Sequence, residues 1–338
     1  MKVGVLMGGA SDERDVSLAS GTQVAVALRT AGHQVVSVDT AQGIMTPEVE
    51  AALVSSGVGQ LPPEAIALST LQEEKVVELL RDPRLAPVDV FFLALHGGIG
   101  EDGTVQGILD TAGVSYTGSD QLGCSLAMDK VATKRVLREA GIPTPDWLAG
   151  SFSANEIEVR LGLPVIVKAA SGGSSLRLVL AHDSAELELA LEESSTWADT
   201  VLYERYHTGR EFTVGVAGGE AFPVGEIVPQ HEIFDYECKY QAGMAQEIFP
   251  ADISSGLAER LRALALEVHG ALQLRDYSRV DFIVDEASRP WCLEANALPG
   301  MTTNSLFPKG AAVAGIGFPE LCDRIAKLAR ARLGDDST

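Results

Sequence analysis

Short apolar runs alternate with helix-like stretches in the first third of the chain. Residues 3–7, 34–38 and 88–95 are apolar runs of strand length. Between the first two, a helix is predicted from apolar residues at helical spacing, which are Val24, Ala27, Leu28 and Ala31, with Gly32 as its stop signal. The alternation predicts a parallel-sheet α/β domain over residues 1–118. Polar loops follow the first and third runs, at the sheet edge where open α/β sheets bind ligands.

The next region, 119–208, opens on a predicted helix over 129–140, with Asp129 as N-cap and Gly141 just past its end. Strands are predicted near 164–168, 176–181 and 200–204, with a helix that starts at 183–184. This pattern indicates a second, central α+β domain.

A third α+β region, 209–338, begins with antiparallel strand candidates at 211–216 and 221–228. Its helix has one apolar stripe, formed by Leu257, Leu261, Leu264 and Val268, and Gly270 is the predicted stop.

Two strand-like runs near the C-terminal end carry oxygen ligands. In 277–284 side chains alternate, so that Arg279 and Asp281 share one face, and in 291–296 Glu294 and Asn296 share another. Two carboxylates and an amide oxygen are hard ligands that suit Mg²⁺ bound to a nucleotide. The alternative is a β-hairpin whose carboxylates only face solvent.

The net charge and the cysteine spacing exclude several classes of partner and of metal site. The 338 residues carry a formal net charge of −21 and the sequence pI is about 4.6, which argues against nucleic-acid or anionic-membrane partners. An anionic substrate would therefore have to bind where several lysine or arginine side chains lie close together. No signal peptide or transmembrane run is recognised, so a cytoplasmic protein is expected. The four cysteines show no C-x-x-C pair or zinc spacing, which favours reduced structural thiols.

Segment 168–175 joins small residues and serines between two predicted strands, a composition that suits a phosphate-covering loop. It is not a Walker A loop. Lys130 and Lys168 would supply cations, although a plain hairpin turn and solvated lysines are the alternative. Further on, Glu204 lies at the end of a predicted strand and Glu211 follows seven residues later. Both could contact the adenosine part of a nucleotide. A strand followed by a charged turn explains them nearly as well.

The loop after the first strand fails the G-x-G-x-x-G spacing of dinucleotide-binding proteins. Its Glu13 could bind a substrate ammonium group. The alternative is an acidic residue that only favours the start of a helix.

These residues resemble the D-alanine–D-alanine ligases of the ATP-grasp superfamily. The resemblance spans nearly the whole chain. Its landmarks, in order, are segments 8–18, 96–103 with 106–107, 128–130, 234–240 and 294–302.

The resemblance implies an ATP-grasp fold, in which an N-terminal parallel-sheet domain is followed by central and C-terminal domains that sandwich ATP. It also implies two magnesium ions, with manganese as a substitute, bound by Asp281, Glu294 and Asn296. ATP would be contacted by Lys130, Lys168, Ser174, Ser175, Glu204, Glu211 and Lys239. A homodimer is expected from the resemblance alone.

For the substrates, the resemblance implies that Glu13 holds the ammonium of the first D-alanine in a network with Ser174 and Tyr240. The other implied substrate residues are His96, Lys239, Ser305 and Leu306. Arg279 and the Gly300 N–H would form an oxyanion hole. ATP would phosphorylate the first D-alanine, and the amine of the second would attack the resulting acyl phosphate. Segment 235–246 would close as a lid, although an ordinary exposed loop is the alternative.

In the resembling family, ligases that use a hydroxy acid tend to replace the tyrosine of this lid, so Tyr240 implies an amine acceptor. The chain departs from the family pattern at Ala169 and at Leu176-Arg177 in the phosphate loop, and at Tyr206-His207 after Glu204. Three alternatives stay open at this point, of which the altered loop motivates the first. They are a ligase of the same scaffold with another substrate in secondary metabolism, a nucleotide-binding homologue without turnover, and a Rossmann dehydrogenase.

Overall fold

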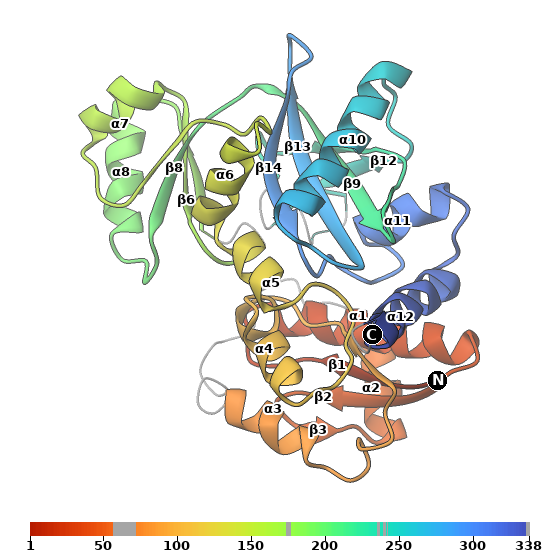
Figure 1. The fold of residues 1–338 in the computed structure, drawn as a ribbon. Helices are drawn as coiled ribbons and strands as arrows, with labels where there is room; N and C mark the ends of the chain where they lie inside the picture. Colours follow the sequence, from red (N-terminus) through yellow and green to blue (C-terminus); the bar gives the residue numbers. More distant parts are fainter. Residues whose placement is uncertain (57–71, 174–176, 235–236, 239–240, 242, 336–338) are drawn as a thin grey trace.

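The computed structural model describes residues 1–56, 72–173, 177–234, 237–238, 241 and 243–335. Three sheets make up the fold (Figure 1): an N-terminal sheet at the bottom of the view, a small sheet at the upper left and a larger one at the upper right.

The N-terminal sheet has the order β3-β2-β1-β4. Its strands are β1 Lys2–Met7, β2 Gln34–Asp39, β3 Gly43–Ile44 and β4 Val90–Leu93. The three predicted strands pair in parallel, as expected, and β3 adds an antiparallel edge. The helices of this part are α1 Arg14–Thr30, α2 Pro47–Ser56, α3 Gln72–Leu80, the 3₁₀ turn η1 Gly98–Gly100 and α4 Thr104–Thr111. The predicted face of α1 is confirmed except at Ala31, which lies past the helix end and is exposed.

The small sheet is antiparallel, with the order β5-β8-β6-β7. Its elements are β5 Trp147–Ala149, α7 Ala154–Leu161, β6 Val165–Ala169, β7 Leu178–Ala181, α8 Ser184–Ser194 and β8 Val201–Arg205. Helices α7 and α8 bury Ile157 and Leu187 against Val165 and Val167 of the sheet. The strands predicted near 164–168 and 200–204 and the helix start at Asp183, which caps α8, are confirmed. The strand predicted near 176–181 begins only at Leu178, and residue 176 lies outside the described residues.

The larger sheet is also antiparallel, with the order β12-β11-β9-β13-β14, and β10 pairs with β9. Its strands are β9 Gly209–Ala217, β10 Glu220–Ala221, β11 Gly225–Pro229, β12 Ala245–Ile248, β13 Tyr277–Asp285 and β14 Pro290–Asn296. The single strand predicted over 221–228 is wrong, because the chain leaves the ladder between β10 and β11. Helix α10, Ser255–Ala271, packs on this sheet and includes Gly270, so the predicted stop is one residue early.

Four helices join these parts: α5 Gln121–Met128, α6 Lys130–Glu139, α11 Leu306–Val313 and α12 Phe318–Asp335. Asp129 caps α6 as predicted, because its carboxylate accepts hydrogen bonds from Val131 N and Ala132 N. Leu137 of α6 is buried with the core of the larger sheet. Helix α12 returns to the N-terminal part and packs against α1.

All four cysteines are buried and free, which confirms the expectation of structural thiols. Among the described residues, no helix is long and apolar enough to span a membrane.

Candidate active site

Three adjoining cavities lie where the sheets meet. One of about 490 Å³ borders the N-terminal part, one of about 250 Å³ lies between the two antiparallel sheets, and one of about 150 Å³ lies under the loop after β6. Glu294 lines all three. Molecules bound in each of the three cavities could therefore approach the Glu294 carboxylate.

The β13–β14 hairpin brings the predicted oxygen ligands together. Asp281 pairs with Glu294, and Arg279 pairs with Asn296, in the antiparallel register. On the opposite face Val280 and Phe282 are fully buried, as the alternation predicts. The solvent-facing alternative is wrong for Asp281, which is 5% exposed.

The Asp281 carboxylate is held by three donors. It accepts hydrogen bonds from Thr213 Oγ1 at 2.7 Å, from Arg279 Nη2 at 2.8 Å and from Asn296 Nδ2 at 3.2 Å. Asn296 donates to Asp281 through Nδ2, so its Oδ1 is the amide atom left to bind a cation. Two carboxylates and an amide oxygen suit a hard cation that completes its shell with water and phosphate oxygens.

Lys168, Glu204 and Glu211 line the cavity between the antiparallel sheets. Lys168 is 7% exposed and its Nζ donates to Glu204 Oε1 at 3.2 Å, so it is not a solvated surface lysine. Burial acts to raise the pKa of Glu204, but Lys134 and Lys168 outweigh it and hold that pKa below its usual value. Glu204 Oε2 is buried and forms an ion pair with Lys134 Nζ at 2.5 Å.

Lys130 lies beside the loop after β6. Its Nζ donates to Gly172 O at 2.7 Å, and its N–H donates to Ala170 O at 2.9 Å. Lys130, Lys168 and Arg177 line the small cavity with that loop. Of the positions that depart from the family pattern, Arg177 is exposed and lines this cavity, Ala169 is buried in β6, and the ring of His207 stacks on Trp291 at 4.4 Å.

Glu13 precedes α1 but makes no capping hydrogen bond with its side chain. The carboxylate instead lies between two glycines: a Cβ at Gly97 would be 2.6 Å from Oε2, and a Cβ at Gly173 would be 2.8 Å from it. Glu13 thus reaches from the N-terminal part to the loop after β6, in the cavity of about 490 Å³. The arrangement disfavours a role limited to starting the helix.

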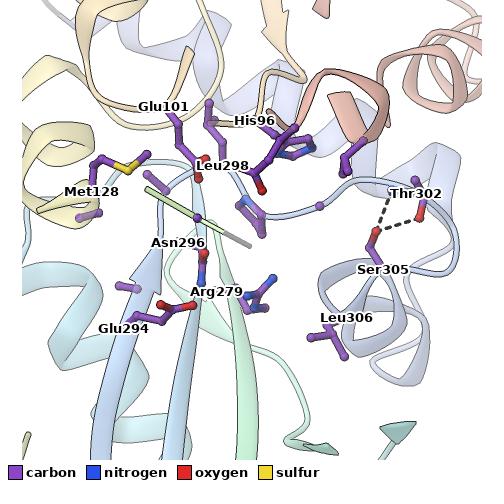
Figure 2. A pocket seen from close by; sticks show the side chains of 18 of the residues that line it. His96, Glu101, Met128, Arg279, Glu294, Asn296, Leu298, Thr302, Ser305 and Leu306 are labelled. Carbon is purple, nitrogen blue, oxygen red and sulfur yellow. Dashed lines mark hydrogen bonds between the residues drawn. The ribbon is translucent and has the colours of Figure 1, made fainter. Parts of the chain in front are cut away.

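His96 and Glu101 line the same cavity (Figure 2). His96 Nε2 lies 3.0 Å from Ser20 Oγ, and Ser20 Oγ accepts from Met301 N at 3.3 Å. Burial lowers the pKa of His96. Burial, followed by the nearby Glu13 carboxylate, raises the pKa of Glu101 to about 8.

The far end of this cavity is formed by the turn before α11. Gly300, Ser305 and Leu306 line it (Figure 2). Ser305 Oγ accepts a hydrogen bond from Thr302 N at 3.1 Å. A side chain at Gly300 would approach Ser305 Oγ to 2.9 Å, so a glycine keeps this passage open.

Four predicted site residues, Ser174, Ser175, Lys239 and Tyr240, lie outside the described residues. Part of the predicted lid does as well, and its last two residues, Ala245 and Gln246, belong to β12.

Sequence reasoning missed Lys134, Thr213 and the electrostatic role of Glu101. Lys134 is fully buried beside Glu204. The available signal was its spacing of four from Lys130, which places both lysines on one helix face. Thr213 carried no signal, because its contact with Asp281 depends on strand pairing between β9 and β13.

Two antiparallel sheets that enclose a cavity with paired lysines and a carboxylate–amide hairpin define an ATP-grasp protein, as predicted. Residues 2–119 match the family model "D-ala D-ala ligase N-terminus", and residues 136–327 match "D-ala D-ala ligase C-terminus". The chain belongs to the D-alanine–D-alanine ligase family.

Individual relatives agree with this assignment. The D-alanine–D-alanine ligase of Desulforudis audaxviator (strain MP104C) is 36% identical over 98% of this chain and 99% of its own length. That of Anaeromyxobacter sp. (strain Fw109-5) is 40% identical, covering 96% and 95%. The crystal structure of D-alanine–D-alanine ligase from Bacillus anthracis complexed with ATP has a TM-score of 0.77 and 32% identity, covering 100% of this chain and 99% of that one.

Proposed function

We propose that this protein joins two D-alanine molecules into D-alanyl-D-alanine, with conversion of ATP to ADP and phosphate, as a step of peptidoglycan precursor synthesis in the cytoplasm. The observation that carries the proposal is the position of Glu294, which lines the nucleotide, phosphate-loop and substrate cavities together. The names of the relatives support the same reaction.

The cavities suit the two half-reactions. A carboxylate oxygen of the first D-alanine attacks the γ-phosphorus, the bond to the β,γ-bridging oxygen breaks, and ADP leaves. The amine of the second D-alanine then attacks the carbonyl carbon, loses a proton and expels phosphate. Lys130 and Lys168 neutralise phosphate charge, while Arg279 and the Gly300 N–H hold the developing oxyanion.

Asp281, Glu294 and Asn296 would hold magnesium, or manganese in its place, and two ions fit the family resemblance. Among the described residues no cluster of three or more His, Cys, Asp or Glu side chains forms a metal site, so the phosphates and water would supply the remaining ligands. The bound ions would neutralise the triphosphate. Glu13 would bind the first ammonium group, and Ser305 and Leu306 would position the second D-alanine.

A panel of substrates tests this proposal. With ATP and Mg²⁺, phosphate release is measured with D-alanine, D-lactate, D-serine and L-alanine, singly and together with D-alanine, and the products are identified by mass. D-alanyl-D-alanine as the dominant product is expected. A dominant ester or mixed product would support the same scaffold with another acceptor, and ATP binding without turnover would support a non-catalytic homologue.

A further inference from the structure

Lys134, in the second turn of α6, is a lysine with 0% exposure. An isolated buried ammonium group is costly, so lysine is rarely found fully buried without partners. A buried lysine next to a nucleotide cavity therefore calls for a specific reason.

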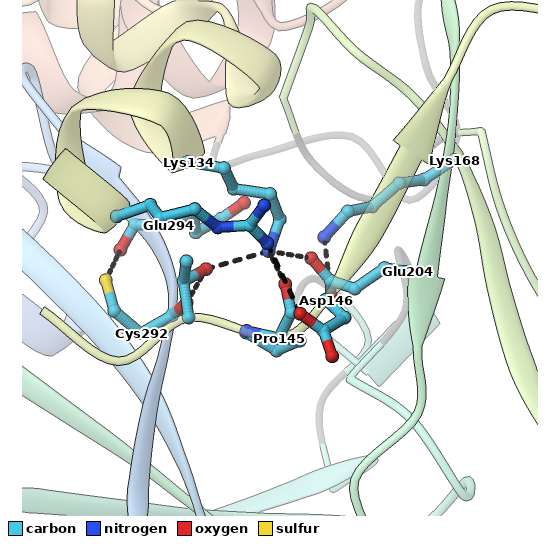
Figure 3. Close-up of polar contacts among 9 residues, drawn as sticks. Lys134, Pro145, Asp146, Lys168, Glu204, Cys292 and Glu294 are labelled. Carbon is cyan, nitrogen blue, oxygen red and sulfur yellow. Dashed lines mark hydrogen bonds and ion pairs between the residues drawn. The ribbon is translucent and has the colours of Figure 1, made fainter. Parts of the chain in front are cut away.

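Its ammonium group has three polar partners, as many as it has protons to donate. Nζ lies 2.5 Å from Glu204 Oε2, and it donates to Thr144 Oγ1 at 2.8 Å and to Pro145 O at 3.1 Å (Figure 3). The ring centroid of Trp147 is 5.4 Å away. The group is thus held in one place.

Those partners lie at the junction of the two antiparallel sheets. Thr144 Oγ1 donates to Cys292 O of β14 at 2.9 Å, and Arg205 N of β8 donates to Asp146 O at 2.9 Å. Through these hydrogen bonds, Lys134 connects α6 and the segment after it to β8 of the small sheet and β14 of the larger sheet, which border the nucleotide cavity.

The charges around Glu204 explain what this contact does. The two oxygens of Glu204 face two ammonium groups, Lys134 on Oε2 and Lys168 on Oε1. Burial lowers the pKa of Lys134, while the Glu204 carboxylate acts against that shift. With both lysines protonated, the three groups carry one net positive charge. Of the two lysines, Lys168 is the one that lines the nucleotide and phosphate-loop cavities, so that charge is available on the side where a triphosphate would bind. Without Lys134, Lys168 would be the sole counter-ion of a buried carboxylate and would be held against it.

We propose that Lys134 is a positioning residue of the ATP site, which neutralises Glu204 so that Lys168 keeps its charge for the phosphates. The inference rests on ATP being the nucleotide of the proposed function. It assigns no contact between Lys134 and ATP.

A double-mutant cycle separates this role from a purely structural one. The variants are Lys134→Met, Glu204→Gln and the two combined, and the control is Arg135→Met, which removes an exposed cation from the same helix. The dissociation constant of ATP is measured by calorimetry without D-alanine, and the KM values for ATP and D-alanine are measured in the joining reaction.

Lys134→Met is expected to weaken ATP binding about tenfold or more, and to leave the KM for D-alanine within about twofold. Arg135→Met should change neither by more than about twofold. In the Glu204→Gln background the same Lys134→Met change should cost less than about threefold, since no carboxylate is left to capture Lys168.

Equal losses in both backgrounds, or unchanged ATP binding in Lys134→Met, would overturn the inference. If Lys134→Met alone does not fold, the comparison in the Glu204→Gln background decides, because no carboxylate is left there to hold Lys168: a loss of about tenfold or more refutes the role. A wild-type protein that binds ATP but forms no dipeptide would refute the proposed function and leave the binding cycle interpretable.

Discussion

Glu13 illustrates how one side chain connects two parts of the molecule. Its carboxylate lies against Gly97 and Gly173, in the cavity where we place the first D-alanine. Glu13→Gln removes the charge that would pair with the ammonium group, an interaction of roughly 1.5–3 kcal/mol, or about 10- to 100-fold. We expect that rise in the KM for D-alanine and little change in the KM for ATP. Steady-state kinetics on both substrates, with Asp15→Asn as the matched control, would refute this role if the two KM values rose together.

Glu294 is the residue at which the three cavities meet. Glu294→Gln keeps its size but removes the negative charge that would hold the metal ions, so turnover should fall by at least about a hundredfold, while folding is retained. The check is dipeptide formation at saturating substrates, alongside the thermal unfolding midpoint. Near-normal activity in a folded variant would remove Glu294 from the mechanism.

Glu101 gives a pH dependence of stability. Burial and the neighbouring Glu13 raise its pKa from 4.5 to about 8, while the nearby Arg279 and the Gly97 N–H act against the shift. The folded state therefore keeps a proton that the unfolded chain loses first. This group destabilises the fold as pH rises from about 4.5 to about 8, by up to about 1.4 kcal/mol per pH unit, and its effect is constant above that window.

Glu101→Gln should abolish this penalty. Urea unfolding across the same pH window is expected to show the variant gaining stability over the wild type as pH rises, with no further gain above it. Parallel pH profiles for the two proteins would contradict the assigned pKa.

At the scale of elements, helix α6 fixes two lysines at once. Its N-cap Asp129 precedes Lys130 directly, and Lys134 follows one turn later. Asp129→Ala should cost about 1 kcal/mol of stability and also raise the KM for ATP, because the first turn holds Lys130. Ser153→Ala at the N-cap of α7 is the control: it should cost a similar amount without changing the KM for ATP. An equal kinetic effect of both variants would argue against a link between the cap and the ATP site.

The elements that sequence predicted well are those with a strong local pattern. The β13–β14 hairpin was predicted because alternation in Val280, Phe282 and Val284 marks a buried face, and the opposite face then had to carry Arg279 and Asp281. The break between β10 and β11 was missed although the sequence carries a local signal for it: Pro223 lies in the gap and has no N–H to donate to a ladder.

Lys134 shows the limit of local pattern. A lysine on a helix is normally solvated, and its burial here depends on β8 and β14 approaching from separate sheets. Glu204 was predicted as an adenosine contact, but its two-lysine environment could not be read from spacing. The burial of Lys134 and the pairing of Glu204 with two lysines both arise only when the two antiparallel sheets come together around the cavity.

For the whole molecule, a formal charge of −21 would repel ATP if it were spread evenly. Lys130, Lys168, Arg177 and Arg279 instead gather at the adjoining cavities. The domain limits at 118 and 208 and the homodimer stay predictions.

In the proposed reaction, D-alanine is activated by transfer of a phosphoryl group to its own carboxylate. The most direct measurement uses D-alanine labelled with ¹⁸O in the carboxylate, with ATP and Mg²⁺, and analyses the released phosphate by mass. We expect one ¹⁸O in each phosphate, formed in step with D-alanyl-D-alanine, because the attacking carboxylate oxygen leaves with the phosphorus. Unlabelled phosphate, or ADP formation that does not depend on D-alanine, would contradict it.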